Sequence, residues 1–529
     1  MFFRFNRFLA RHPALRDALL WVLPAIIFGA ALRLMMLHYS PYAYWGADSF
    51  SYYEFTHRFA ADYSISLNEK RRVLYPILMA MVTVLPGVPL QWLAWLQHGF
   101  GLLTLVPLAY VMRKTFTFWR WWTIPVTVLY AGLPVVLWYE HELLGETLFF
   151  AFVVWAFAGW IAWAKEPQRE RAARLWWLFF APFALLILTK PSARFFWPGL
   201  LIGLVLVVAW RKLRPIHYAA LAALMVVTLN IGSTKQGKWF LYVASFPLTQ
   251  LDTPLHAEYK AEIRDMVAAR RERLDYYYRE DREPFLFTRN PRAFPERQLW
   301  ATLAKDGDRC SSVYMALSLE AIKAEPLNFL YLGLQRTIFS ANLSDFKEGR
   351  FEADYFPVRF QSYYDKAVEH LEKDKQTPIP LALGFPVAGP LPPFEEVARQ
   401  LSPAPESASA RLVMAWVKRY EAASDLVRAP KNSTVAQARP TMLGYWLLLG
   451  IALSFTGAYR STAGVWTLAA LGYLAGVFLV SEQNPRYFGA VWPVFFPLLA
   501  VPADFLCRTG AAFLKRRTGR REEAPAESV

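Results

Sequence analysis

About ten apolar runs divide the chain, and polar or charged residues gather in the segments between them. A helix of roughly 20 mostly apolar residues crosses about 30 Å of hydrocarbon, so runs of this kind are typical of transmembrane helices. The pattern predicts spans at 18–38, 90–111, 122–138, 147–163, 176–190, 195–210, 218–234, 440–457, 464–481 and 487–503.

Two large segments, 39–89 and 235–439, separate the spans on one side of the membrane. The second contains three stretches with helical periodicity, which begin at PLHAEYK, SSVYMAL and SASARLV, and it shows little strand alternation. The middle stretch is amphipathic and rich in aromatic residues, which favours a position along the membrane surface.

These spans and loops predict an all-α polytopic membrane protein with four parts. The first apolar run is not followed by a small-residue cleavage signal, so we expect a retained anchor helix. The expected parts are an N-terminal membrane domain of about seven spans at 1–234, an extracytoplasmic, mainly helical domain at 235–439, three further spans at 440–505 and a disordered cytoplasmic tail at 506–529.

The composition supports a membrane protein and excludes several other classes. The chain is 55% hydrophobic and only 19% charged, which is too apolar for a soluble multidomain protein of 529 residues. The 21 Trp and 26 Tyr suit the membrane–water interface. Two cysteines exclude a disulfide scaffold and a Cys-rich metal site.

The net charge of +16 is mostly a topology signal. If the N-terminus lies in the cytoplasm, the segments on its side hold 21 basic and seven acidic residues, whereas the rest of the chain holds 37 and 35. Basic residues concentrate in cytoplasmic loops, so this orientation is favoured and a nucleic-acid partner is not expected. We expect the bacterial inner membrane, with the large loops in the periplasm. The segments counted on the cytoplasmic side, with the N-terminus, are 1–17, 112–121, 164–175, 211–217, 458–463 and 504–529.

Ionisable residues collect in the outer loops, where every loop carries an acid, a base or both. Charges at helix mouths are costly, so their placement indicates a functional site. Carboxylates suit proton transfer or metal binding, and Arg and Lys suit a lipid-linked phosphate. The candidates are Asp48 and Tyr52 and Tyr53 in WGADSFSYY, Arg72 in KRRVLYP, His141, Glu142 and Glu146 in YEHELLGETLFF, Lys190 and Arg194 in LTKPSARFFWP, and Arg486 and Tyr487 in NPRYFG.

The order of these motifs, from WGADSFSYY through RRVLYP, ELLGETLFF and TKPSARFFWP to NPRYFGAVWPVFFP, resembles the GT-C superfamily of integral-membrane glycosyltransferases. Within it, the chain is most similar to polyprenyl-phosphate-sugar users, the group of protein O-mannosyltransferases and lipid A aminoarabinose transferases. The resemblance covers about 1–235 and 440–505. It implies a helical membrane fold and a lipid-linked donor.

The resemblance also implies roles for individual residues. Asp48 stands at the position of the catalytic acid, although many members have two adjacent acids there and this chain has Ser49. Glu146 corresponds to the family's turn glutamate, with Glu142 one helical turn earlier. The pair Arg486 and Tyr487 matches residues that face the lipid phosphate in similar proteins. Lys190 stands where relatives often carry Arg.

Simpler roles for these residues stay open. Asp48 also fits a solvated loop, and Glu146 also fits a charge that complements the helix dipole. His141 and Glu142 begin like a zinc-protease HExxH motif, but Gly145 replaces the second histidine, which excludes that class. No cofactor is certain; a divalent metal on His141, Glu142 or Glu146 stays open, since some relatives bind one.

The sequence therefore predicts an inverting glycosyltransferase that moves a sugar from a polyprenyl phosphate to a glycan, lipid or protein acceptor on the periplasmic side. Asp48 would act as the base. The donor phosphate would lie among Lys190, Arg486, Arg72 and Arg194, and Glu142, Glu146, Tyr52, Tyr53 and Tyr487 would contact the substrate. An undecaprenyl-diphosphate glycan ligase or polymerase shares much of this chemistry. A lipid or solute transporter is the other alternative, although transporters place polar groups near the bilayer midplane.

Overall fold

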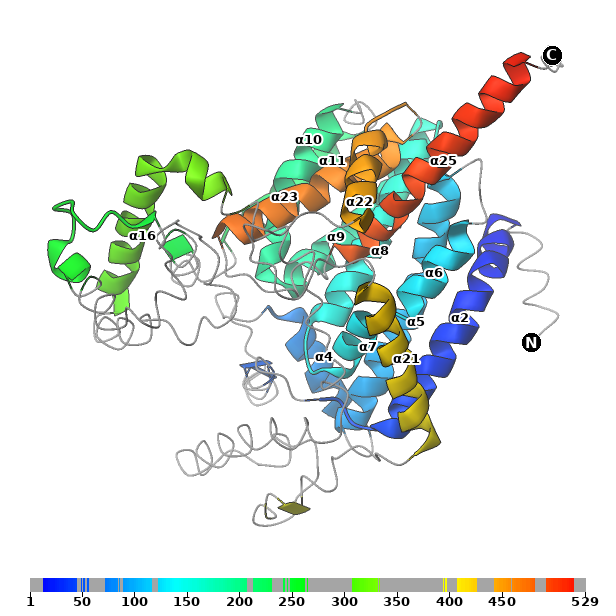
Figure 1. Cartoon of the computed structure of the whole chain (residues 1–529), viewed down its shortest axis with the longest axis horizontal. Coiled ribbons are helices and arrows are strands. Elements are labelled where there is room, and N and C mark those ends of the chain that lie inside the picture. Colours follow the sequence, from blue (N-terminus) through cyan, green and yellow to red (C-terminus); the bar gives the residue numbers. More distant parts are fainter. Residues whose placement is uncertain are drawn as a thin grey trace.

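The computed structural model describes part of the chain, and the statements below concern that part (Figure 1). The described residues are 13–44, 49, 51–52, 55–56, 72–83, 85, 89–116, 122–206, 213–230, 241–242, 245, 248–261, 264, 307–331, 333, 393, 395–396, 407–425, 442–457, 459–480 and 491–517.

The described elements are helices, and the predicted all-α class is confirmed. One isolated bridge between Tyr44 and Glu142 is the β-type pairing found within the described ranges. The helices are α2 (Pro13–Tyr39), α4 (Leu74–Thr83), α5 (Pro89–Thr115), α6 (Thr123–Ala131), α7 (Pro134–His141), α8 (Glu146–Lys165), α9 (Arg169–Thr189), η2 (Pro191–Phe195), α10 (Phe196–Leu206), α11 (Pro215–Asn230), α16 (Gly307–Ala324), α21 (Ala408–Asp425), α22 (Met442–Ser454), η10 (Arg460–Gly464), α23 (Val465–Val480) and α25 (Trp492–Arg517).

Each of the ten predicted spans coincides with a helix or a helix pair, and the protein is a multi-pass membrane protein. Five helices are long and apolar enough to cross a membrane: Leu20–Tyr39, Leu90–Thr115, Glu146–Lys165, Arg169–Thr189 and Pro493–Leu514. Among the described helices, α6 and α7 pass this test together as a bent pair, and the other four predicted spans do not pass it. The third span is the pair α6 and α7, bent by 46°, and α10, α11, α22 and α23 have 11 to 16 residues.

The break in the third span has a local cause. Pro134 lacks the N–H that would continue the α6 ladder, and its ring disfavours a helical residue before it. The carbonyls that the break exposes find donors on other elements. Arg33 Nη1 of α2 donates to the Ala131 carbonyl at 3.0 Å, and Trp416 Nε1 of α21 donates to the Gly132 carbonyl at 2.6 Å.

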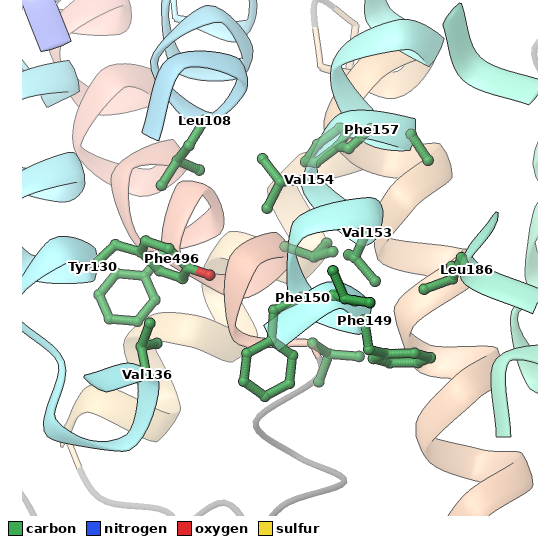
Figure 2. Packing of buried hydrophobic residues seen from close by; sticks show 14 of the residues in the cluster. Leu108, Tyr130, Val136, Phe149, Phe150, Val153, Val154, Phe157, Leu186 and Phe496 are labelled. Carbon is green, nitrogen blue, oxygen red and sulfur yellow. The ribbon is translucent and has the colours of Figure 1, made fainter. Parts of the chain in front are cut away.

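Helix α8 lies at the centre of the bundle, packed between α5 and α9. Figure 2 shows Phe149, Phe150, Val153, Val154 and Phe157 of α8 among side chains from several other helices. The approach of α9 requires Gly159, because a Cβ there would lie 2.2 Å from the Leu178 carbonyl oxygen. This packing fixes the first turn of α8, which carries Glu146.

Helix α21, from the 235–439 segment, packs along the membrane bundle. The Trp416 ring meets Phe28 of α2 edge to face at 5.2 Å between centroids. Val413 and Val417 of α21 are buried in the same core as α2 and α8. One helix of the large insert is thus joined to α2 and to the break between α6 and α7.

Candidate functional site

The candidate site forms around the turn between α7 and α8, residues 142–145. The Tyr44 N–H donates to the His141 carbonyl at 2.6 Å, and the Leu143 N–H donates to the Tyr44 carbonyl at 2.8 Å. Ser49 Oγ donates to the Leu143 carbonyl at 2.9 Å. Residues on both sides of positions 45–48 are therefore fastened to this turn.

A buried glutamine on α5 braces the same turn from the other side. Gln97 Nε2 lies 3.0 Å from the carbonyl oxygens of both Glu140 and Glu142 and donates to them. The Tyr75 hydroxyl of α4 donates to Gln97 Oε1 at 2.5 Å. The backbone of the turn is thus satisfied by named side chains, as buried polar groups require. This bracing orients the carboxylates that follow.

Glu146 and Lys190 form a buried ion pair, with Lys190 Nζ 2.6 Å from Glu146 Oε1. Glu146 is the first residue of α8 and Lys190 follows the last residue of α9, so each charge also complements its helix dipole. Lys190 Nζ lies 5.6 Å from the Phe149 ring centroid. Glu146 and Lys190 were predicted as separate site residues, and in the structure they form an ion pair.

Two tyrosines and a second glutamate complete the carboxylate side of the site. Tyr52 and Tyr75 pack edge to face with centroids 5.1 Å apart. Burial raises the pKa of Tyr75, and the nearby Tyr52, Glu146 and Glu142 raise it further. Glu142 Oε2 accepts a hydrogen bond from Trp138 Nε1 at 2.8 Å. Tyr52, Glu142, Glu146 and Lys190 therefore lie in one region of the structure.

Two arginines lie close together at the same end of the molecule. Arg72 precedes α4 and is 3% exposed, and Arg194 lies in η2, four residues after Lys190. Burial lowers the pKa of Arg72 to about 10, and the positive charge of Arg194 lowers it further. Arg72 is buried and Arg194 is exposed, and two guanidinium groups that repel each other favour an anion between them.

A second buried network connects α2, α5 and α7. Arg33 Nη2 lies 2.5 Å from Glu140 Oε1, and His98 Nδ1 lies 2.9 Å from Glu140 Oε2. His98 Nε2 contacts His141 Nδ1 at 2.9 Å. The His141 ring packs edge to face against Tyr44 at 4.6 Å between centroids. Arg33 is thus paired with Glu140.

Gly101 on α5 makes room for this network. A Cβ at Gly101 would lie 1.8 Å from Glu140 Oε1, so only glycine admits the carboxylate in this place. Arg33 lies six residues before the end of α2, about 9 Å along the axis, and His98 lies nine residues after the start of α5, about 14 Å. The network therefore lies in the half of the bundle where α2 ends and α5 begins.

Several predicted residues cannot be located. Asp48, Tyr53, Arg486 and Tyr487 lie outside the described residues. No three His, Cys, Asp or Glu side chains among those described lie together as a metal site requires, and the metal on His141, Glu142 or Glu146 stays a prediction. Sequence analysis missed Gln97 and His98. Their signal was an adjacent polar pair inside the apolar run QWLAWLQHGFG.

Comparisons with known proteins found similarity among solved structures. No family model and no curated protein matches the chain. Among solved structures, it is similar to the archaeal oligosaccharyltransferase AglB from Archaeoglobus fulgidus in complex with an inhibitory peptide and a dolichol-phosphate. The identity is 12% and the TM-score 0.41, and the alignment covers 96% of this chain. The chain spans about half of that protein, 52%.

Proposed function

We propose that the protein is an inverting glycosyltransferase that transfers a sugar from a polyprenyl-phosphate donor to an acceptor at the outer surface of the membrane. One observation carries the proposal. Two carboxylates, a cation and two tyrosines from four separate segments meet at one end of the bundle, where Glu142, Glu146 and Lys190 lie with Tyr52 and Tyr75. Such a mixture suits a neutral sugar next to a phosphate.

The donor phosphate lies between Arg72 and Arg194 in this proposal. Their mutual repulsion is relieved by a phosphate, and guanidinium groups bind phosphate through paired hydrogen bonds. Arg486 would add a third cation from the loop before α25. Lys190 contributes less charge than the sequence suggested, because Glu146 neutralises it. In our proposal, Lys190 therefore both fixes the position of Glu146 and faces the donor.

Asp48 is the proposed base. Its carboxylate takes the proton of the acceptor hydroxyl while the acceptor oxygen attacks the anomeric carbon. The bond from that carbon to the phosphate oxygen breaks, and the electron pair leaves with the polyprenyl phosphate, which the arginines stabilise. The hydrogen bonds of Tyr44 and Ser49 to the turn support this assignment, because they bring the ends of the Asp48 segment to Glu142.

The remaining parts of the proposal follow the predicted topology. The site faces the periplasm across a bacterial inner membrane, the polyprenyl tail lies among membrane lipids, and the 235–439 segment chooses a glycan, lipid or protein acceptor. Tyr52 contacts the sugar, as Tyr53 and Tyr487 would if they face the same site. A divalent metal on Glu142, Glu146 or His141 would add a further positive charge near the departing phosphate.

The placement of the buried charges disfavours a transporter. Transport sites lie near the bilayer midplane, often at broken helices. The α6–α7 break is of that kind, but its exposed carbonyls are bonded to Arg33 and Trp416. In the predicted topology, the network of Arg33, Glu140 and His98 also lies in the outer half of the bundle. A ligase that uses a diphosphate-linked glycan differs from our proposal only in its donor.

The test uses purified protein in detergent or nanodiscs with a panel of polyprenyl-phosphate sugars and polyprenyl-diphosphate glycans. We expect release of free polyprenyl phosphate from one monophosphate donor, and loss of that release in Asp48→Asn. Asp252→Asn is the matched control, because Asp252 is an exposed acid of the large insert whose pairing with Arg264 is solvent-screened. Absence of turnover with every donor, or full turnover in Asp48→Asn, would defeat the proposal.

A further inference from the structure

The residues that follow α16 form a short helix with an uncovered apolar face. Pro326 starts a new helical stretch after Glu325, and the described residues of this stretch are 326–331 and 333. Leu327 is 78% exposed, Leu330 54% and Tyr331 53%. Positions i, i+3 and i+4 share one face of a helix, so these three side chains form a single apolar patch.

The opposite face joins the membrane bundle. Phe329 is buried in a small cluster with Leu248 and Ala321, and Leu479 packs against that cluster. A Cβ at Gly333 would lie 2.5 Å from the Leu479 side chain, so the stretch lies close to α23 there. Figure 1 shows α16 beside the bundle, with the chain that follows it leading back toward the end of α23.

The position of Leu479 indicates what covers the apolar patch. Leu479 is the second-last residue of α23, Val465–Val480, whose C-terminal end is the outer end in the predicted topology. The patch is therefore at the level where the bilayer meets water. Leucine beside tyrosine suits that level, and exposed Lys323 and Asn328 next to the patch suit the polar headgroups.

We propose that Leu327, Leu330 and Tyr331 insert into the outer leaflet, so that residues 326–331 anchor the α16 part of the insert to the membrane surface. The occupant of the patch is lipid, since an exposed apolar patch beside the end of a predicted transmembrane helix would otherwise face water. This inference is independent of the proposed enzymatic activity. It rests on exposure and on the contacts with Leu479.

Nitroxide scanning of the full-length protein in nanodiscs tests the proposal. Cys310→Ser and Cys507→Ser remove the native thiols, and Leu327→Cys or Leu330→Cys then places one label on the patch. Val205→Cys on α10, where Val205 is 67% exposed on a predicted span, gives the lipid reference. Lys323→Cys, exposed near the end of α16, gives the water reference. Collisions with oxygen report lipid, and collisions with a water-soluble nickel chelate report water.

We expect the oxygen-to-nickel collision ratio at 327 and 330 to exceed the Lys323 reference several-fold and to lie below the Val205 reference, which is deeper in the bilayer. Ratios equal to that at Lys323 would show a water-exposed patch and overturn the proposal. Low collision rates with both reagents would show that protein covers the patch, from this chain or from a second copy, and would overturn it equally. Two label positions keep the test decisive if one variant fails to elute as a single species.

Discussion

Replacing Gly101 with alanine tests whether the Arg33–Glu140–His98 network stabilises the packing of α2, α5 and α7. In an ordinary helix this change would stabilise the protein by about 1 kcal/mol, because alanine loses less backbone entropy than glycine. Here the new Cβ would lie 1.8 Å from Glu140 Oε1, whereas real Cβ contacts lie beyond 3.0 Å. The carboxylate must therefore move by more than about 1 Å.

That movement breaks two contacts at once. Glu140 Oε1 lies 2.5 Å from Arg33 Nη2, and Oε2 lies 2.9 Å from His98 Nδ1. Both partners are buried, and separating a buried ion pair costs about 3–5 kcal/mol. After the gain in helix propensity, Gly101→Ala should lose about 2–4 kcal/mol of unfolding free energy.

Gly99→Ala on the same helix is the matched control, since a Cβ at Gly99 would meet nothing within 4 Å. We expect it to match or exceed the wild-type stability. Unfolding by SDS in mixed micelles, followed by circular dichroism, measures both variants. Adding Gly101→Ala to Glu140→Ala should cost nothing further, because the clashing carboxylate is gone. The reasoning is refuted if Gly101→Ala is as stable as Gly99→Ala.

Three further predictions concern the site and its supports. Trp416→Phe should destabilise the protein by about 1–3 kcal/mol, because the Gly132 carbonyl loses its indole donor. Leu412→Ala, on the exposed side of α21, should not destabilise it. SDS unfolding measures both variants, and equal losses of stability would contradict the role of this hydrogen bond. Lys190→Met should lower the free energy of unfolding by about 3–5 kcal/mol, because it leaves buried Glu146 without its cation. The double variant Lys190→Met, Glu146→Gln should recover most of that loss in the same assay. If the effects of the two single variants simply add, the pair is not coupled. Donor affinity should be constant from neutral pH to about pH 9 and fall above about pH 10, where Arg72 loses its proton. Burial is the main cause of this lowered pKa and repulsion by Arg194 adds to it, so Arg194→Met should shift the fall only partly toward higher pH. A KM that stays flat through this pH range would exclude Arg72 from phosphate binding.

The sequence by itself determined where the membrane helices lie, because twenty apolar residues in a row have no other stable environment in a chain of this kind. It also identified the acids and bases between the helices, since charges at helix mouths stand out against an apolar background. The 46° bend between α6 and α7 was not predicted, because 122–138 was taken as a single span.

Only the tertiary structure decided how those charges are paired. Lys190 and Glu146 are 44 residues apart, and Arg33 and Glu140 are 107 apart, so nothing in local periodicity connects them. In the sequence, Gln97 and His98 are only two polar residues in an apolar run. The packing of α5 against α7 brings them to the end of α7, where they bind Glu140 and His141. Pairing depends on which helices become neighbours, and that is set by the interlocking of side chains such as those around Gly101 and Gly159, which the apolar pattern alone does not encode.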